Sequence, residues 1–313
     1  MRRREFIRTS AVGAAAAFAP HFLQGAPVMP KRTLGRTGVQ LSMLGFGGIL
    51  VRDEEQSTAN EMVAKAYDHG ITYFDVAPTY GNAEDKLGPA LESCRKNCFL
   101  ACKTTERSAK GAETELQRSL KKLRTDYFDL YQLHAITTVE DVETAFAADG
   151  AMETFLNAKE KGLIRYLGFS AHSEKAALLA MEYYDFDTIL FPINFAAWYK
   201  GEFGPRVVEK AKETDKGILA LKGLVHRRFN EGEENPYPKT WYVPISEEDD
   251  ELARLAFSWT YAQGVTAAIP PGQPLFWDRA FRIAADVSPL TEKEREKVRD
   301  TAALVEKPIF ATV

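Results

Sequence analysis

The segment that sets the fold reads Ile71-Thr72-Tyr73-Phe74-Asp75-Val76-Ala77-Pro78-Thr79-Tyr80-Gly81. Its first seven residues are a short, mostly apolar run, which is typical of a strand buried on both faces of a parallel sheet. The preceding residues, Glu55–Asp68, have the composition and spacing of an amphipathic helix. Asp75 and Tyr80 stand where the expected strand ends and its loop begins. The segment therefore predicts one unit of a repeated β/α fold.

The same unit recurs along the whole chain. The eight short apolar runs are Leu41–Gly47, Ile71–Ala77, Cys98–Thr104, Tyr127–His134, Ile164–Ser170, Thr188–Phe195, Gly217–Lys222 and Thr266–Pro270. Helical patterns separate them, for example Ser108–Leu123, Met152–Lys161 and Glu174–Tyr183. Eight such units predict an α/β fold of the (β/α)8 TIM-barrel type. An open doubly wound sheet is the alternative, but its Gly-x-Gly-x-x-Gly turn follows none of the runs.

Two segments fall outside the repeat. Lys31–Gln40 predicts an N-terminal β-hairpin, and Thr291–Val305 predicts an extra helix near the C-terminus. The chain has 313 residues, of which 45% are hydrophobic, so we expect residues 27–313 to form a single barrel domain. The formal net charge is −4 and the basic residues are spread among acids, so nothing indicates nucleic-acid binding.

Residues 1–26 differ in character from the rest of the chain. They begin with several arginines and continue with a weakly apolar run that is too short to span a bilayer, which is typical of a signal peptide. Arg3-Arg4-Glu5-Phe6 is similar to the twin-arginine (Tat) pattern, which predicts export to the periplasm by the twin-arginine machinery. The cleavage point and retention as an uncleaved membrane anchor stay open. Because this route carries folded proteins, the leader also hints at a cofactor bound before export.

Four polar residues lie at the ends of successive expected strands or just after them: Asp75, Tyr80, Lys103 and His134. Active sites of such barrels are built at the carboxyl ends of the strands, and neighbouring strands lie about 4.8 Å apart, so these side chains should converge. A phenol is a weak acid unless a cation such as Lys103 stabilises its phenolate. Asp75 would keep the lysine charged, and His134 would hold a carbonyl oxygen. Tyr80 would then donate a proton as hydride reaches the carbonyl carbon.

These motifs resemble those of a known family, the aldo-keto reductases. Lys31–Gly38 looks like the family's N-terminal hairpin, and Phe74–Gly81 is similar to its Asp-to-Tyr signature. The resemblance implies that the four strand-end residues form a catalytic tetrad in which Tyr80 is the general acid. It also implies an oxidoreductase that transfers hydride from NADPH or NADH to an aldehyde or ketone, or works in reverse. The cofactor would be bound without a Rossmann domain.

The resemblance also implies a set of residues that bind the cofactor. Gly168-Phe169-Ser170 is similar to the family's site for the nicotinamide amide, where Ser170 would hold the carboxamide. Ala171 and Leu190 depart from the asparagine and glutamine that the family usually has nearby. Lys222, at a strand end, is expected at a cofactor phosphate. The expected cofactor-binding residues are Gly47, Gly48, Ser170, Asn194, Lys222 and Gly272.

The choice between NADPH and NADH depends on a site for the adenosine 2′-phosphate. The lysine and arginine that many family members use there are not evident after Ala268–Gly272, the counterpart of the strand-eight signature. Arg279 or Arg282 would have to replace them. We expect NADPH and keep NADH as the alternative.

Substrate contacts are expected from the longest irregular segment, Leu224–Ile245. Loops of this length usually carry function. Trp241 and Tyr242 could wall an apolar pocket, while Arg227 and Arg228 could attract an acidic substrate. A solvated loop with buried anchor aromatics is the alternative.

No metal site is predicted from the three cysteines. Cys98 and Cys102 would lie about 13 Å apart on a strand, too far for one ion or a disulfide, so we expect free thiols. A Cys94–Cys98 bridge is the less favoured alternative.

The expected partners are a small carbonyl compound and the export machinery. The alternative function is a cofactor-binding sensor or regulatory subunit with little turnover.

Overall fold

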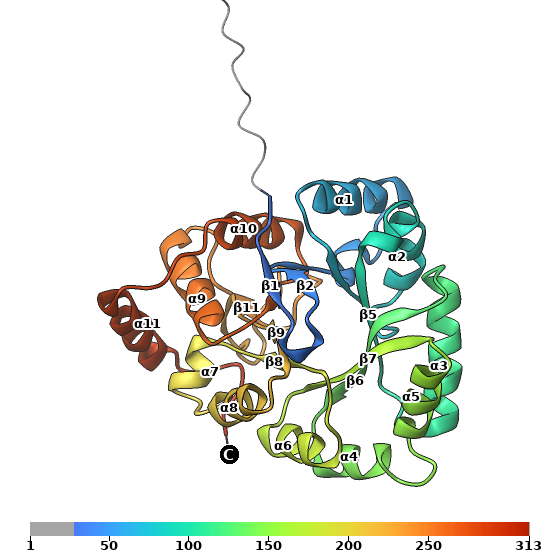
Figure 1. Ribbon diagram of the computed structural model, residues 1–313. Helices are drawn as coiled ribbons and strands as arrows, with labels where there is room; N and C mark the ends of the chain where they lie inside the picture. The colour runs from blue at the N-terminus through green and yellow to red at the C-terminus, as the bar shows by residue number, and fades with distance from the viewer. Residues whose placement is uncertain (1–27, 313) are drawn as a thin grey trace, which may run out of the picture.

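Figure 1 shows the computed structural model of the protein, which describes residues 28–312. The predicted signal peptide, residues 1–26, lies outside this range. Eight parallel strands form one sheet in the order β12-β9-β8-β7-β6-β5-β4-β3, and a parallel bridge between Leu44 and Ala268 brings its two edges together. The strands are β3 (Gly45–Gly47), β4 (Tyr73–Asp75), β5 (Phe99–Thr104), β6 (Phe128–Ile136), β7 (Ile164–Ala171), β8 (Thr188–Pro192), β9 (Gly217–Leu221) and β12 (Ala267–Ile269). The predicted (β/α)8 barrel is confirmed.

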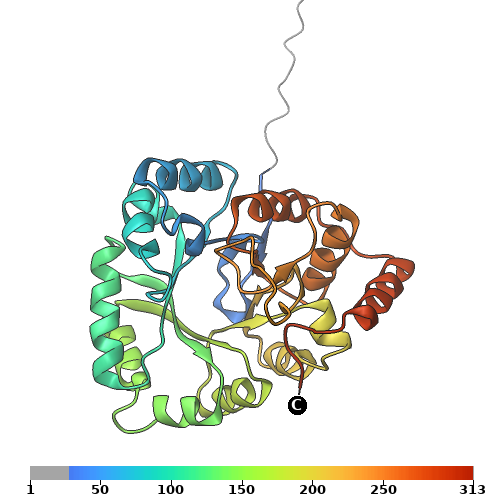
Figure 2. The same cartoon turned by 180° about the vertical axis from the view of Figure 1, so that it is seen from behind.

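Helices surround the barrel on its outside (Figures 1 and 2). They are α1 (Gln56–Asp68), α2 (Ala83–Leu91), α3 (Ala109–Lys122), α4 (Val139–Ala145), α5 (Ala151–Glu160), α6 (Glu174–Tyr183), α7 (Phe195–Tyr199), α8 (Pro205–Glu213), α9 (Asp250–Ala262), α10 (Pro274–Ala285) and α11 (Glu292–Leu304). In strand β5, alternate side chains pack into two different hydrophobic cores, one on each face of the sheet. Leu100 and Cys102 belong to the outer cluster that packs against helices, whereas Phe99 and Ala101 belong to the cluster inside the barrel. This alternation directs Lys103 inward.

The N-terminal hairpin closes one end of the barrel. Its strands are β1 (Lys31–Thr33) and β2 (Gln40–Ser42), and Leu34 and Leu41 are buried in the inner cluster. Gly35 has φ +46°, and a Cβ there would lie 2.4 Å from the backbone nitrogen of Gly217, so this turn requires glycine. The hairpin blocks the amino-terminal end of the barrel, which leaves the carboxyl ends of the strands for a site.

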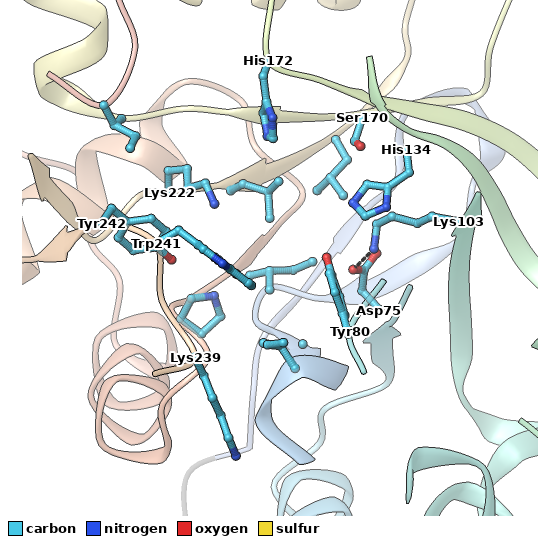
Figure 3. A pocket seen from close by; sticks show the side chains of 18 of the residues that line it. Asp75, Tyr80, Lys103, His134, Ser170, His172, Lys222, Lys239, Trp241 and Tyr242 are labelled. Carbon is cyan, nitrogen blue, oxygen red and sulfur yellow. Dashed lines mark hydrogen bonds and ion pairs between the residues drawn. The ribbon is translucent and has the colours of Figure 1, made fainter. Parts of the chain in front are cut away.

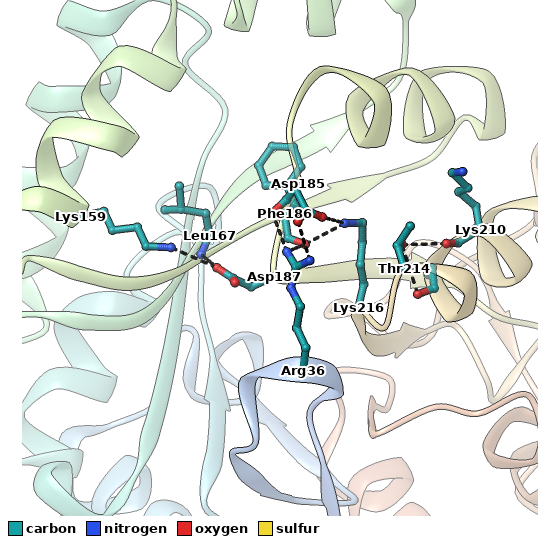
Figure 4. Close-up of polar contacts among 10 residues, drawn as sticks. Arg36, Lys159, Leu167, Asp185, Phe186, Asp187, Lys210, Thr214 and Lys216 are labelled. Atoms are coloured by element: carbon teal, nitrogen blue, oxygen red, sulfur yellow. Dashed lines mark hydrogen bonds and ion pairs between the residues drawn. The ribbon is translucent and has the colours of Figure 1, made fainter.

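A network of ion pairs holds the hairpin to the neighbouring loops (Figure 4). Arg36 Nη1 and Lys216 Nζ each lie 2.5 Å from a carboxylate oxygen of Asp185. Both cations also donate to the carbonyl of Phe186. Hydrogen bonds from Arg36 and Lys216 lower the pKa of Asp185 to about 2, so this carboxylate stays charged at neutral pH.

Several predicted strands differ in extent from the observed ones, for example Ile71–Ala77 against β4, and two of the differences have a clear cause. The prediction of a single strand over Leu41–Gly47 is wrong, because Gln40–Ser42 pairs in the hairpin and only Gly45–Gly47 enters the barrel. The hydroxyl of Ser42 accepts from the backbone N–H of Thr72 and donates to the carbonyl of Leu44, which replaces main-chain pairing at the break. The strand predicted over Thr188–Phe195 ends at Pro192, since Asn194 already caps the short helix α7.

The C-terminal part of the chain returns to the open end of the barrel. Helix α11 confirms the predicted extra helix and begins with a capping box between Thr291 and Glu294. The tail after it crosses the carboxyl ends of the strands, where the carbonyl of Lys307 accepts from the backbone N–H of Arg228 at 3.0 Å. None of the helices within residues 28–312 is long and apolar enough to cross a membrane.

Candidate active site

A cavity of about 320 Å³ lies at the carboxyl ends of the barrel strands, and all four predicted strand-end residues line it (Figure 3). Asp75 ends β4, and Tyr80 belongs to the loop that follows. Lys103 and His134 come from β5 and β6. The structure therefore brings together the side chains that the strand-end pattern singled out.

Asp75 and Lys103 form an ion pair that is almost fully shielded from solvent, with side-chain exposures of 3% and 1%. Lys103 Nζ also donates to the carbonyl of Val76 at 3.2 Å. The second carboxylate oxygen of Asp75 accepts from Tyr73 and from Gln132, both at 3.3 Å. Burial lowers the pKa of Lys103, but the charge and hydrogen bond of Asp75, together with the neighbouring Tyr80, outweigh this and the pKa is raised. The lysine is therefore a permanent cation at neutral pH.

Tyr80 lies beside this cation. Lys103 Nζ is 5.4 Å from the centre of the Tyr80 ring, and the rings of Tyr80 and His134 meet edge to face at 5.9 Å. Burial raises the pKa of Tyr80, and Lys103 opposes that effect without cancelling it. The expected influence of Lys103 thus has the predicted direction, but desolvation exceeds it. Tyr80 keeps its proton at neutral pH and has a fixed cation ready to stabilise the phenolate once the proton leaves.

His134 is a neutral imidazole in this environment. Burial, followed by the charge of Lys103, lowers the pKa of His134 well below its usual range. Its Nδ1 atom is buried without a hydrogen-bond partner within residues 28–312. Arg107 Nη2 donates to the His134 carbonyl at 2.7 Å and fixes this end of β6. A neutral imidazole can donate one N–H to a carbonyl oxygen without acting as a competing acid.

The residues expected to bind a cofactor divide into two groups. Gly47, Ser170, Lys222 and Gly272 line the cavity. The Ser170 hydroxyl accepts from the backbone N–H of Ala135 at 2.8 Å, so its own proton is free for a ligand. Gly48 and Asn194 do not line the cavity.

Asn194 and Gly48 have structural roles instead of the predicted cofactor contacts. The Asn194 side-chain oxygen accepts two backbone N–H groups at the start of α7, and its amide donates to the carbonyls of Lys222 (3.1 Å) and Val225 (2.7 Å). All hydrogen-bonding groups of the Asn194 side chain are therefore in use. A Cβ on Gly48 would lie 2.7 Å from Val76 Cγ2, so this glycine permits close packing of two loops.

The residues expected to contact the substrate also divide into two groups, one that lines the cavity and one that does not. Trp241 and Tyr242 line the cavity, with Trp241 60% exposed at its mouth and Tyr242 buried. Arg227 lies outside it and pairs with Glu233 at 2.7 Å, and Arg228 donates to the carbonyl of Ile309. The structure thus assigns these two arginines to loop and tail packing, which does not agree with the expected attraction of an acidic substrate.

Arg279 and Arg282, proposed for a 2′-phosphate, lie away from the cavity beside α9. Arg279 is 4% exposed, pairs with Asp250 at 2.9 Å and donates to the carbonyl of Ser246 at 2.7 Å. Arg279 is therefore committed to packing. Arg282 lines a shallow surface groove with Arg254.

Sequence reasoning missed several residues that line the cavity, among them His172, Lys239, Ile309 and Phe310. His172 stacks on Phe310 with ring centres 5.2 Å apart. Lys239 Nζ contacts Glu54 at 2.6 Å and the carbonyl of Leu50 at 2.7 Å, which ties the segment after β9 to the one after β3. Lys239 lies inside the long loop already singled out, but no local pattern marks the tail residues.

The three cysteines are free and buried, as expected. No group of three or more metal-ligating side chains occurs in the part of the chain that the structure describes.

Comparison with known proteins gives a consistent result. The sequence model of the aldo/keto reductase family matches residues 43–273. An uncharacterized oxidoreductase of Bacillus subtilis, YqkF, is 32% identical over 157 residues, which cover 46% of this chain and 49% of that protein. The chain thus matches about half the length of that relative. The aldo-keto reductase str7 of Strobilurus tenacellus is 24% identical over 91% of this chain and 92% of its own length.

Solved structures show the same similarity. An aldo-keto reductase structure from Pseudomonas aeruginosa is 27% identical, with a TM-score of 0.66 over 82% of this chain and 94% of that chain. The holo form of aldo-keto reductase AKR11C1 from Bacillus halodurans has a TM-score of 0.69 over 90% of this chain and 98% of that chain, and at 23% identity it supports the fold alone.

Proposed function

Because this chain belongs to the aldo/keto reductase family, we propose that it is an NAD(P)H-dependent oxidoreductase that reduces an aldehyde or ketone to an alcohol, or runs the reverse reaction. One observation carries the proposal. A protonated phenol, a permanent cation and a neutral imidazole face one cavity at the strand ends of a (β/α)8 barrel. These groups suit the stabilisation of negative charge on a carbonyl oxygen followed by its protonation.

The residues of the cavity fit a nicotinamide cofactor. Ser170 offers a free hydroxyl proton, and Gly47 and Gly272 contribute backbone without side chains to the wall. A Cβ on Gly272 would lie 2.5 Å from Ile49 Cγ2 and 2.8 Å from the carbonyl of Lys239, so glycine lets this part of the wall pack closely against both segments. Such a cofactor supplies the hydride when bound. The Ser170 hydroxyl would hold its amide.

The remaining steps belong to the protein's own side chains. His134 and Tyr80 donate hydrogen bonds to the carbonyl oxygen and orient the substrate. As negative charge develops on that oxygen, Tyr80 transfers its proton and an alcohol results. Lys103 stabilises the phenolate that is left, and Asp75 holds Lys103 in place. Trp241 shields the mouth of the cavity from solvent.

The assay that tests this function follows oxidation of NADPH and of NADH with a panel of aldehydes and ketones. Carbonyl-dependent turnover supports a reductase, and the ratio of kcat/KM for the two cofactors measures the preference, for which we propose NADPH. Since Arg279 is committed to Asp250, Arg282 is the remaining candidate for the 2′-phosphate. Binding of a cofactor without turnover of any substrate would instead favour the sensor function.

The pH profile of reduction should lack a histidine inflection. The pKa of His134 lies well below 6.5 and that of Tyr80 above 10.0. A general acid works while it is protonated, so kcat/KM for a neutral aldehyde should stay flat through neutral pH and fall only above about pH 10. Steady-state rates in buffers of constant ionic strength measure this. A fall of activity centred near the usual histidine pKa of about 6.5 would contradict the assignment of a neutral His134.

We also propose that the protein reaches the periplasm through the twin-arginine pathway, which rests on the pattern Arg3-Arg4-Glu5-Phe6. Replacing Arg3 and Arg4 by lysine should strongly reduce the amount of protein in the periplasmic fraction, because the export machinery recognises the arginine pair. Fractionation and immunoblotting measure the effect, with a single Arg8→Lys change as the matched control. Equal periplasmic yields from wild type and double variant would refute this route.

A further inference from the structure

Lys222 differs from the other two lysines that line the active-site cavity. Lys103 is paired with Asp75 and Lys239 with Glu54. No carboxylate within residues 28–312 lies within 4.0 Å of Lys222 Nζ, although its side chain lines the same cavity. The amine lies across the cavity from Tyr80 and His134 (Figure 3). An unpaired cation thus faces the groups that would hold the carbonyl oxygen.

The structure holds Lys222 firmly in this place. Its backbone has φ +68°, a left-handed conformation that is uncommon outside glycine and that tends to occur at functional sites. The carbonyl of Lys222 accepts from the Asn194 amide at 3.1 Å and from the backbone N–H of Val225 at 3.0 Å. Lys222 Nζ lies 4.6 Å from the centre of the Tyr242 ring and 6.0 Å from that of Trp241. Asn194 is therefore a positioning residue for Lys222.

Among the residues that the structure describes, no carboxylate compensates the charge of Lys222. Asp75 is the single carboxylate among the described residues that line the cavity, and Lys103 already neutralises it. Burial lowers the pKa of Lys222 to about 8, so the amine is mostly charged at neutral pH. After burial, the charge of Lys222 further lowers the pKa of neighbouring His172, to about 4. A buried cation of this kind is stabilised most by an anionic ligand, because little water reaches the site to screen its charge.

We propose that Lys222 binds a carboxylate of the carbonyl substrate, so that the enzyme prefers aldehyde or keto acids to neutral carbonyl compounds of the same size. This inference rests on the proposed reductase function. Tyr80 and His134 would hold the carbonyl oxygen, and Lys222 would hold the acidic group on the opposite side of the cavity. The competing source of an oxyanion is the pyrophosphate of the cofactor. The position of the amine across from Tyr80 favours the substrate.

The test uses the full chain and two matched aldehydes, 4-formylbenzoate and its methyl ester. A charge-assisted hydrogen bond corresponds to a preference of about 10- to 100-fold, so Lys222→Met should lower kcat/KM for the acid by that factor, mainly through KM. The ester should change less than about threefold. Lys222→Arg should retain part of the preference. Lys175→Met, which removes an exposed lysine near the same end of the barrel, should leave the preference intact and controls for overall charge.

Direct binding measurements separate the possible sources of the anion. Quenching of tryptophan fluorescence reports binding of the acid without turnover, and NADPH titration reports the cofactor. Weaker NADPH binding by Lys222→Met, with equal losses on acid and ester, would assign Lys222 to the pyrophosphate and overturn the proposal. A wild type that binds the acid through Lys222 but never reduces it would contradict the reductase function alone.

The wild-type protein offers a second test that needs no substitution. The titratable groups facing Lys222 are His134 and His172, which are neutral at neutral pH, and the protonated phenols of Tyr80 and Tyr242. As the pH rises through about 8, Lys222 loses its charge, so the ratio of kcat/KM for acid over ester should fall. A ratio that stays constant from neutral pH to about two units above that pKa would overturn the proposal.

Discussion

Replacing Tyr80 with Phe is expected to lower kcat/KM for carbonyl reduction by about 10³-fold, within the range that a positioned general acid contributes. The Tyr80 ring lies 5.4 Å from the buried cation Lys103 and meets that of His134 edge to face. Phe keeps the ring and removes the proton. His134 cannot take over, because the low pKa of this imidazole leaves it without a proton of sufficient acidity at neutral pH.

The same variant also separates catalysis from folding. The Tyr80 hydroxyl lies in the cavity beside Lys103 and is not part of the hydrophobic core, so its loss should change the free energy of unfolding by less than about 1 kcal/mol. Binding of NADPH, measured by fluorescence, should stay close to that of the wild type. Retention of more than about a tenth of the wild-type kcat/KM would show that another group is the acid.

Lys103→Met should have the largest combined effect on turnover and stability. The substitution removes the cation beside Tyr80 and leaves the Asp75 carboxylate buried without its partner. Breaking a buried ion pair in this way costs about 3–5 kcal/mol of unfolding free energy, although hydrogen bonds from Tyr73 and Gln132 to Asp75 should hold the loss near the lower end. Turnover should fall by at least about 10²-fold, because the phenolate of Tyr80 loses its stabilising charge. Chemical denaturation and steady-state assays measure the two effects.

A double variant provides the control for this prediction. Asp75→Asn combined with Lys103→Met removes both charges and should recover most of the lost stability. Turnover should not recover, since the cation beside Tyr80 is still absent. A single Lys103→Met variant that is as stable as the wild type would show that Asp75 readily becomes protonated or solvated, which would argue against the proposed rigid pair.

Local patterns were sufficient for the architecture. Predicted helix Glu174–Tyr183 coincides with α6, and strand Ile164–Ser170 differs from β7 by one residue. The spacing of apolar residues in helices and strands is visible within short windows of sequence, so both elements can be predicted without knowledge of distant contacts. The predicted strand bounds are wrong where residues distant in sequence form a contact. For example, the backbone N–H of Thr72 donates to the Ser42 hydroxyl, and the first predicted strand is divided there.

The amino-acid sequence by itself thus determined the barrel and the four polar residues at its strand ends, because the carboxyl ends of parallel strands must meet. Only the tertiary structure decided which of the other polar groups are free to act. It commits Asn194 and Arg227 to internal partners and brings His172 against Phe310 from the distant C-terminal tail. Within residues 28–312 it also leaves Lys222 Nζ with no carboxylate closer than 4.0 Å. Hydrogen bonds and charge pairs between distant residues depend on three-dimensional proximity, which no local period encodes.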